Sequence, residues 1–286
     1  MNTVTIVLNE EEQKKLKEQY HDAKICKTPP YANYQIKLSD CTITAYQSGK
    51  VVFQGEGANY HSGSYQKATE TNAKTIFPQC GSDEVGTGDF FGPVVVCACY
   101  IDQILYDKIK ELKIMDSKQL KDEQILKIAP TLMEILPHSI LILNNEKYNS
   151  VHNDNNMNAI KAKLHNAAYV HLEKKLKQLP DLNVVDQFAV EKTYFSYLKN
   201  EKKVIRKLHF ETKAESKYIS VACASMIARY AFLKEMSAME KLYDMVFPKG
   251  ANKEVNESAK KFCMRYGENQ LNKVAKIHFA NTKKIC

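Results

Sequence analysis

The chain has 286 residues, 44% of them hydrophobic and 26% charged, with 10 glycines and 8 prolines. This composition excludes collagen-like, low-complexity and wholly disordered proteins, and the length suits one large domain or a medium domain with a small one. Basic residues outnumber acidic residues by 41 to 33, and the net charge of +8 weakly favours a polyanionic partner such as a nucleic acid.

The apolar segments are too short for a membrane-spanning helix. The longest, VVVCACYI over residues 94–101, is well below the roughly 20 residues that such a helix needs. The N-terminal sequence MNTVTIVLNEEEQKK has no basic segment of the kind that begins a signal peptide. We therefore expect a cytoplasmic protein without a membrane partner.

The eight cysteines are scattered along the chain without a CxxC pair. Several of them, including Cys97 and Cys99, lie in apolar segments, which favours buried thiols over disulfides. Two thiols on one face of a strand are too few for a zinc site. Any metal is therefore expected to be held by oxygen ligands.

The first 70 residues predict a small α+β domain. Residues 2–8 alternate as a strand, and 10–26 read as a charged amphipathic helix that the sequence TPP ends. Three short strands are expected over 34–38, 41–46 and 50–53. A helix and a polar stretch follow, and we place a linker at 71–78 because Pro78 interrupts the pattern there.

The rest of the chain predicts an α/β domain with a mixed sheet. Residues 94–101 form a continuous apolar run, which is typical of a strand buried on both faces. Two more strands are expected, over 139–143 and 182–186. Long helices are expected over 122–136, 156–179, 218–239 and 253–266.

The segment GSDEVGTGDFFGP over residues 81–93 is the strongest candidate for a functional site. Asp83 and Glu84 are adjacent carboxylates at the end of a strand, and glycine-rich backbone follows them, so the segment is unfavourable without a ligand. A hard divalent cation would relieve the repulsion, and the backbone at Gly86 and Gly88 can approach a substrate closely. A tight acidic turn without a ligand is the alternative.

Two further acids are expected near this segment. Asp186 ends the strand over 182–186, and carboxylates at the ends of neighbouring strands converge, although an Asp here can also cap the next helix. Glu215 precedes a helix rich in small residues, whose close packing can bring it toward the other acids. The alternative for Glu215 is an exposed salt-bridge residue.

Six motifs occur in one order from residue 79 to the C-terminus, namely GSDEVGTGDFFGPVVV, MDSKQL, NNMNAIKAKLHN, VVDQFA, KAESKYISVACASMIAR and KIHFANTKK. Together they resemble bacterial ribonuclease HIII, of the type 2 ribonuclease H family. The resemblance implies an α/β ribonuclease H-like fold over 79–286, with a mixed central sheet, flanking helices and further C-terminal helices. It also implies that residues 1–70 form a substrate-binding domain similar to the TATA-binding protein.

The same resemblance implies the roles of individual residues. Asp83, Glu84, Asp186 and Glu215 would be the catalytic, metal-binding carboxylates. Gly86, Thr87 and Gly88 would read the 2′-hydroxyls of RNA, and Lys118 in the DSKQL segment would meet a substrate phosphate. Ribonuclease HII typically has arginine between the two glycines and Asp as the fourth acid, so Thr87 and Glu215 favour ribonuclease HIII.

The implied activity is endonucleolytic hydrolysis of the RNA strand of an RNA/DNA hybrid by two metal ions, leaving 5′-phosphate and 3′-hydroxyl ends. Mg²⁺ is the expected ion, with Mn²⁺ as a substitute. Asp83 would bridge the ions, with Glu84 and Asp186 on the leaving-group ion and Glu215 on the other. The alternatives are incision at single ribonucleotides in DNA, as by ribonuclease HII, and a non-catalytic nucleic-acid-binding module. We expect a monomer without an obligatory protein partner.

Several other side chains keep two interpretations. Lys161 and His165 share one face of the helix over 156–179, which is consistent with a phosphate contact or with a solvated helix face. Lys118, taken alone, is also typical of a solvated residue behind a helix N-cap. The aromatic side chains of the N-terminal domain are expected to divide between its core and a binding surface, namely Tyr31, Tyr34, Tyr46, Phe53 and Tyr60.

Overall fold

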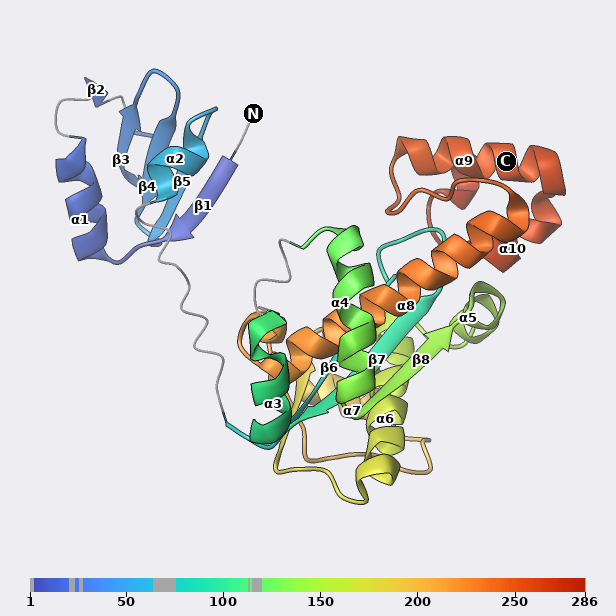
Figure 1. Ribbon diagram of the computed structural model, residues 1–286. Coiled ribbons are helices and arrows are strands. Elements are labelled where there is room, and N and C mark those ends of the chain that lie inside the picture. The colour runs from blue at the N-terminus through green and yellow to red at the C-terminus, as the bar shows by residue number, and fades with distance from the viewer. Residues whose placement is uncertain are drawn as a thin grey trace. The chain divides into compact units, whose positions relative to one another are not determined.

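The computed structural model describes residues 3–20, 24–25, 28–63, 76–112, 114 and 120–285. The chain separates into two compact units, Met1–Thr71 and Asn72–Cys286, and each unit has its own five-stranded sheet (Figure 1). No helix in the described ranges is long and apolar enough to cross a membrane. Of the linker expected over 71–78, only residues 76–78 fall within these ranges.

The N-terminal unit is an antiparallel sheet with two helices, and its strand order is β1-β5-β4-β3-β2. Helix α1 begins with a capping box, in which Asn9 and Glu12 each bond the other's backbone N–H with a side-chain oxygen. The elements are β1 (Thr3–Val7), α1 (Glu10–Gln19), β2 (Lys24–Ile25), β3 (Ala32–Lys37), β4 (Thr42–Tyr46), β5 (Lys50–Gln54) and α2 (Ala58–Gly63).

The prediction of one helix over 10–26 is wrong beyond Gln19. Helix α1 ends there, and Lys24–Ile25 instead pair antiparallel with Lys37 and Ile36 of β3. The backbone hydrogen bonds that this strand makes with β3 come from a partner distant in the sequence, and such tertiary pairing overrides local helix propensity.

The two faces of the N-terminal sheet differ in character. Ile36, Ile43 and Phe53 lie on the inner face, in the core that the helices cover. Tyr34 and Phe53 are buried, which confirms the predicted core positions for these two aromatic side chains. Tyr31 and Tyr60 are 80% and 83% exposed.

The C-terminal unit contains the predicted mixed sheet, with strand order β10-β9-β6-β7-β8. Strand β6 is central: it runs parallel to β9 and antiparallel to β7. The elements are β6 (Gln79–Val85), β7 (Val94–Ile101), α3 (Gln103–Ile109), α4 (Asp122–Ile135), β8 (His138–Leu143), α5 (Asn145–His152), α6 (Met157–Leu176), β9 (Leu182–Asp186), α7 (Glu191–Tyr197), β10 (His209–Glu211), α8 (Ile219–Tyr243), α9 (Lys253–Tyr266) and α10 (Leu271–Val274).

Helices cover both faces of this sheet. Helix α8 packs on β6 and β7 together with α4, and α6 packs on the opposite side. The alternation of side chains along β7 is consistent with this arrangement. Val95 and Cys97 lie in the core between the sheet and α8, while Val96 and Ala98 lie in the core between the sheet and α6. The prediction of a strand buried on both faces is therefore confirmed.

The described cysteines are all free thiols, and five of them are buried, namely Cys41, Cys80, Cys97, Cys99 and Cys223. This confirms the prediction of buried thiols for these positions. Cys97 and Cys99 both lie in the core between the sheet and α8, on the same face of β7 as predicted.

Candidate functional site

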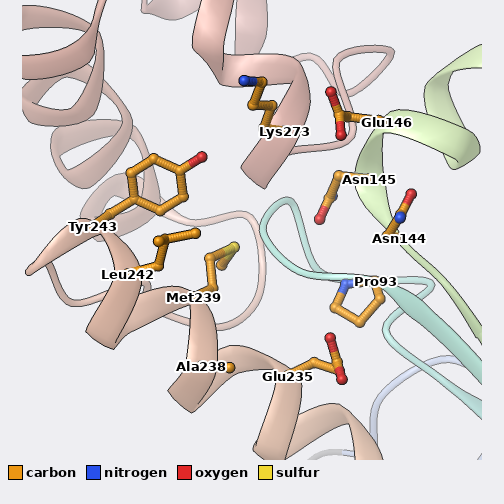
Figure 2. A pocket seen from close by; sticks show the side chains of 10 residues that line it. All are labelled: Pro93, Asn144, Asn145, Glu146, Glu235, Ala238, Met239, Leu242, Tyr243 and Lys273. Carbon is orange, nitrogen blue, oxygen red and sulfur yellow. The ribbon is translucent and has the colours of Figure 1, made fainter.

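An open pocket of about 440 Å³ lies between α8, α5 and α10 (Figure 2). Pro93, at the end of the glycine-rich loop, forms part of its wall. Its charged side chains are Glu146, Glu235 and Lys273, so acids outnumber bases in the lining. None of the expected carboxylates lines this pocket, so the candidate site lies outside it, around those acids.

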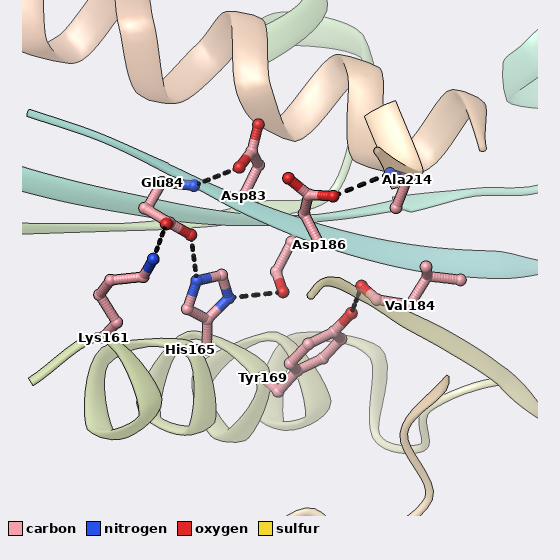
Figure 3. A network of polar contacts seen from close by, with 9 residues as sticks. Asp83, Glu84, Lys161, His165, Tyr169, Val184, Asp186 and Ala214 are labelled. Carbon is pink, nitrogen blue, oxygen red and sulfur yellow. Dashed lines mark hydrogen bonds and ion pairs between the residues drawn. The ribbon is translucent and has the colours of Figure 1, made fainter. Parts of the chain in front are cut away.

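Asp83 and Glu84 point to opposite faces of the sheet, because successive side chains of a strand alternate. Asp83 faces α8, where Ser225 hydrogen-bonds its carboxylate, and Glu84 faces α6 (Figure 3). Asp83 is 8% exposed and also accepts a hydrogen bond of 2.7 Å from the backbone N–H of Glu84. The adjacent acids thus meet different surroundings.

The parallel pairing of β6 and β9 brings Asp83 and Asp186 together. Ser82 is in register with Val185, so the next residue of each strand, Asp83 and Asp186, lies on the same face. Asp186 Oδ1 accepts a hydrogen bond of 2.8 Å from the Ala214 N–H. Asp186 therefore fixes the turn at Ala214–Ser216, whose Ala214 packs with Val184 of β9, and the N-cap of the next helix is Val190 instead. Glu215 lies in this turn and is partly buried.

The pKa of Asp83 is raised to about 8 by burial and by the neighbouring acids. Burial has the largest effect, and the charges of Glu84 and Asp186 raise the pKa as well, while the hydrogen bonds from Ser225 and from the Glu84 N–H lower it. The protein thus keeps a carboxyl group where its ionised form is unfavourable without a cation. Perturbed carboxyl groups of this kind are frequent at functional sites.

Both carboxylate oxygens of Glu84 have basic partners on α6. Lys161 Nζ contacts Oε1, and His165 Nε2 lies 2.9 Å from Oε2. The Lys161 ammonium also lies 4.0 Å from the ring centroid of Phe188. Although burial raises the pKa of Glu84, its hydrogen bond and ion pairs with His165 and Lys161 outweigh that effect and lower the pKa below its ordinary value.

The basic residues belong to a buried polar row on α6. Lys161, His165 and Tyr169 are spaced four residues apart, and His165 Nδ1 lies 2.8 Å from Ser82 Oγ. Tyr169 Oη donates a hydrogen bond of 2.6 Å to the Val184 carbonyl. Lys161 and His165 are 8% and 0% exposed, so the solvated face is wrong for both. Ser82 is fully buried, which excludes it as a nucleophile despite its Glu–His partners.

The donors of this site suit a hard cation, because Asp83, Asp186 and Glu215 offer only oxygen atoms. In the described part of the chain, however, no three Asp, Glu, His or Cys side chains converge on one point as a preformed metal site. Glu84 is the member that departs most, since its oxygens contact Lys161 and His165. The acids are therefore assembled around the ends of β6 and β9 without being closed around one centre.

The two glycines of the loop after β6 have different surroundings. Gly86 is buried with φ +90°, and a Cβ there would lie 2.1 Å from the Pro93 carbonyl oxygen, so the loop itself requires glycine. Gly88 is exposed, and a Cβ there would meet nothing within 4 Å. Thr87 between them is partly exposed. Lys118, the predicted phosphate contact, lies outside the described residues.

Sequence patterns did not identify the partners of Glu84. The signal that was available is the composition of α6, whose apolar residues include Ile160, Ala162 and Leu172 on several sides of the helix, all of them buried. A helix that is buried on most sides leaves its polar residues in need of buried partners. This argument would have directed Lys161 and His165 toward the sheet.

Comparison with known families gives two matches. The model described as ribonuclease HII matches residues 80–282, and a domain of unknown function matches residues 3–76. Ribonuclease HIII of Bacillus subtilis is 42% identical to this chain, over 94% of this chain and 92% of that protein. Ribonuclease HIII of Bacillus cereus is 41% identical over 99% of this chain and 97% of that protein.

Solved structures give the same relationship. The crystal structure of Bst-RNase HIII in complex with Mn²⁺ matches with a TM-score of 0.73 and 38% identity, over 99% of this chain and 98% of that one. The ribonuclease H2 of Pyrococcus horikoshii matches with a TM-score of 0.61 and 25% identity. It covers 73% of this chain and 97% of its own.

Proposed function

The chain belongs to the ribonuclease HIII family and is a ribonuclease H endonuclease, and we propose that it hydrolyses the RNA strand of RNA/DNA hybrids at the C-terminal ends of β6 and β9. The observation that carries the proposal is the pairing of the buried Asp83 with Asp186, whose mutual repulsion a divalent cation would relieve. The products would carry 5′-phosphate and 3′-hydroxyl ends.

Two divalent ions, when bound, would supply an activated water and stabilise the leaving 3′ oxygen of an in-line displacement. We propose Mg²⁺ with Mn²⁺ as a substitute, supported by the Mn²⁺ complex of the Bst relative and by the all-oxygen donor set. Asp83 would be shared between the ions. Glu84 and Asp186 would lie on the leaving-group side, and Glu215 on the side of the attacking water.

The test is a cleavage assay on four substrates: an RNA/DNA hybrid, a DNA duplex with one ribonucleotide, an RNA duplex and a DNA duplex. With Mg²⁺ the full-length protein should cut only the hybrid efficiently, and EDTA should stop the reaction. Preferred cutting at the single ribonucleotide would support a ribonuclease HII-like activity instead. Binding of the hybrid without any cutting would support a non-catalytic module.

We propose that the backbone of the loop formed by Gly86, Thr87 and Gly88 reads the 2′-hydroxyls of the RNA strand, with Lys118 contacting a phosphate. Gly88→Val tests this, because the space around Gly88 lets the variant fold while its side chain blocks close approach of the substrate. Cleavage of hybrids should fall roughly 100-fold, since a displacement of about 1 Å costs that much.

Thr87→Val is the matched control for Gly88→Val, because it places the same residue at the neighbouring position. Threonine already has a β-branched side chain of similar size, so this change adds no bulk to the loop. It should retain most of the activity, and both variants should melt like the wild type. Gly86→Val is unsuitable, since its Cβ clashes with the loop. A Gly88→Val variant that cleaves hybrids at the wild-type rate would rule out the loop as the reader.

We propose that the N-terminal domain, residues 1–70, binds the hybrid through the outer face of its sheet. This face is opposite the core, and adjacent strands align its side chains in rows such as Gln35, Thr44, Val52 and Thr5, of which Thr44 is buried and accepts a hydrogen bond from Gln35. Among the described residues of this face, the charged ones are Lys37 and Lys50. Strands β1, β3, β4 and β5 contain no acidic residue. Amides, hydroxyls and lysines suit a nucleic-acid backbone.

Replacing Lys37 and Lys50 together by Glu should raise KM for the hybrid by roughly tenfold at physiological salt, with little change in kcat, because the proposed catalytic acids lie in the other unit. The salt dependence of KM should also become weaker. The control pair is Lys14→Glu with Lys15→Glu on α1, on the helix side of the sheet, and it should leave KM near the wild-type value. Equal effects of the two pairs would exclude the outer face as a specific binding surface.

We further propose, as expected from the sequence, that the enzyme acts in the cytoplasm as a monomer and needs no obligatory protein partner.

A further inference from the structure

The C-terminal motif KIHFANTKK has no role in the function proposed above, yet it contacts the glycine-rich loop. The Gly92 N–H donates a hydrogen bond of 3.0 Å to the Val274 carbonyl, and the Lys276 N–H donates one of 2.8 Å to the Phe90 carbonyl. Phe91 and Ala275 form an antiparallel β-bridge between these bonds. The second half of the loop is thus paired with a segment more than 180 residues later in the sequence.

The side chain of Lys276 extends this contact into the loop. It is fully buried, and its ammonium donates hydrogen bonds to the carbonyl oxygens of Asp89, at 2.8 Å, and Gly92. Asn145 Nδ2 donates a second hydrogen bond, of 2.9 Å, to the Gly92 carbonyl. Within the described ranges no carboxylate forms an ion pair with Lys276, so its ligands are backbone carbonyls at two points of one loop.

The loop is also held from a second side. Asp89 Oδ1 accepts a hydrogen bond of 2.6 Å from the Gly250 N–H, and the Phe90 N–H donates one of 2.9 Å to the Gly250 carbonyl. The Asp89 N–H reaches back to the Gly86 carbonyl at 3.4 Å. Residues 89–92 are therefore fixed, and they determine where the exposed Gly88 lies.

A buried ammonium is costly to desolvate, and an apolar side chain of similar length would fill the same space without that cost. Burial lowers the pKa of Lys276 to about 7, against the opposing effect of Asp89. Such a residue is therefore best explained by its hydrogen bonds, because an ammonium or a neutral amine can hold two carbonyls at a fixed separation, and Met cannot.

We propose that Lys276 is a positioning residue that fixes the Gly86–Gly88 loop for recognition of the RNA 2′-hydroxyls. The inference rests on the proposed function, in which this loop reads the RNA strand. Lys276 itself is too deeply buried to touch a substrate, so it acts through the carbonyls of Asp89 and Gly92.

A double-mutant cycle tests the proposal by combining Lys276→Met in the protein with a 2′-deoxy substitution in the substrate. Binding is measured in an Asp83→Asn background so that no cleavage occurs. Kd is measured for a hybrid and for a series of hybrids with one 2′-deoxynucleotide at successive positions. With an intact loop, removal of the hydroxyl that the loop reads should weaken binding about tenfold. With Lys276→Met, hybrid binding should weaken about tenfold, and the same deoxy substitution should then cost less than about threefold.

Lys273→Met is the matched control, because Lys273 is exposed and lies one helical turn earlier in the same segment. It should leave the deoxy effect unchanged. Asn145→Ala removes the other side-chain donor to the Gly92 carbonyl and should reduce the deoxy effect in the same direction, which keeps the test decisive if Lys276→Met folds poorly.

The outcomes separate the two claims. If the intact loop shows the deoxy effect and both Lys276→Met and Asn145→Ala retain it in full, the positioning role is overturned while the loop remains the reader. If no deoxy substitution weakens binding with the intact loop, and Gly88→Val cleaves hybrids normally, the loop is not the reader and both claims are overturned. If the effects of Lys276→Met and of the deoxy substitution on the binding free energy are strictly additive, Lys276 has only a structural role.

Discussion

Asp83→Asn is expected to reduce hybrid cleavage by about 10³-fold or more while it stabilises the metal-free protein. The loss of activity follows because removing a carboxylate charge from a metal site forfeits several kcal/mol of transition-state stabilisation. The gain in stability follows because Asp83 is buried beside Glu84 and Asp186, and Asn can keep the hydrogen bonds with Ser225 and the Glu84 N–H. Single-turnover kinetics and thermal melts in EDTA measure the two effects.

The pH dependence of stability gives the prediction a second measurement. The pKa of Asp83 is raised to about 8 in the folded protein, so the folded state binds more protons than the unfolded state between about pH 4 and pH 8. The wild type should therefore lose stability relative to Asp83→Asn as the pH rises through this range. Parallel curves for the two proteins, or near wild-type turnover by the variant, would contradict the assignment of Asp83.

Glu84→Gln is expected to have the opposite effect on stability, although the two acids are neighbours in the chain. It removes the charge that compensates the buried Lys161 ammonium, and breaking one partner of a buried ion pair costs about 3–5 kcal/mol. Combining Glu84→Gln with Lys161→Met should restore much of this loss, because no uncompensated charge remains. Denaturant unfolding of the two single variants and the double variant measures the coupling.

Glu201→Gln is the control for Glu84→Gln, since Glu201 faces Lys163 of the same helix at 3.9 Å with both side chains more than a third exposed. It should change the free energy of unfolding by no more than about 0.5 kcal/mol, as is usual for exposed pairs. Equal losses from Glu84→Gln and Glu201→Gln would mean that the Lys161 contact adds no stability. An additive double variant would lead to the same conclusion.

The long elements of the fold were predictable from the sequence because their patterns extend over several turns or pairs. The strands at Val94–Ile101 and Leu182–Asp186 and the helix at Lys253–Tyr266 occur with the predicted bounds. Helices α3, α5 and α7 have 7, 8 and 7 residues, which is too short for a helical period to stand out. Strand β10 has 3 residues and exists through its pairing with β9.

The residues of the candidate site could be predicted from the sequence, but their arrangement in space could not. Adjacent acids at a strand end indicate a cation site, but the sequence alone does not say which helix each acid meets. That Glu84 meets Lys161 and His165 depends on the packing of α6, whose residues lie more than 70 positions away. The burial of Lys276 likewise depends on a tertiary contact, with the loop at Asp89 and Gly92.

The position of β6 in the middle of its sheet has a consequence for protein engineering. Hydrogen bonds to β7 on one side and β9 on the other prevent β6 from slipping by one residue, a shift that would exchange the surroundings of Asp83 and Glu84. A scaffold that is to receive this acid pair therefore needs an interior strand with helices on both faces. One of those helices must carry a base at the level of the second acid, whereas an edge strand would leave the orientation of the pair unfixed.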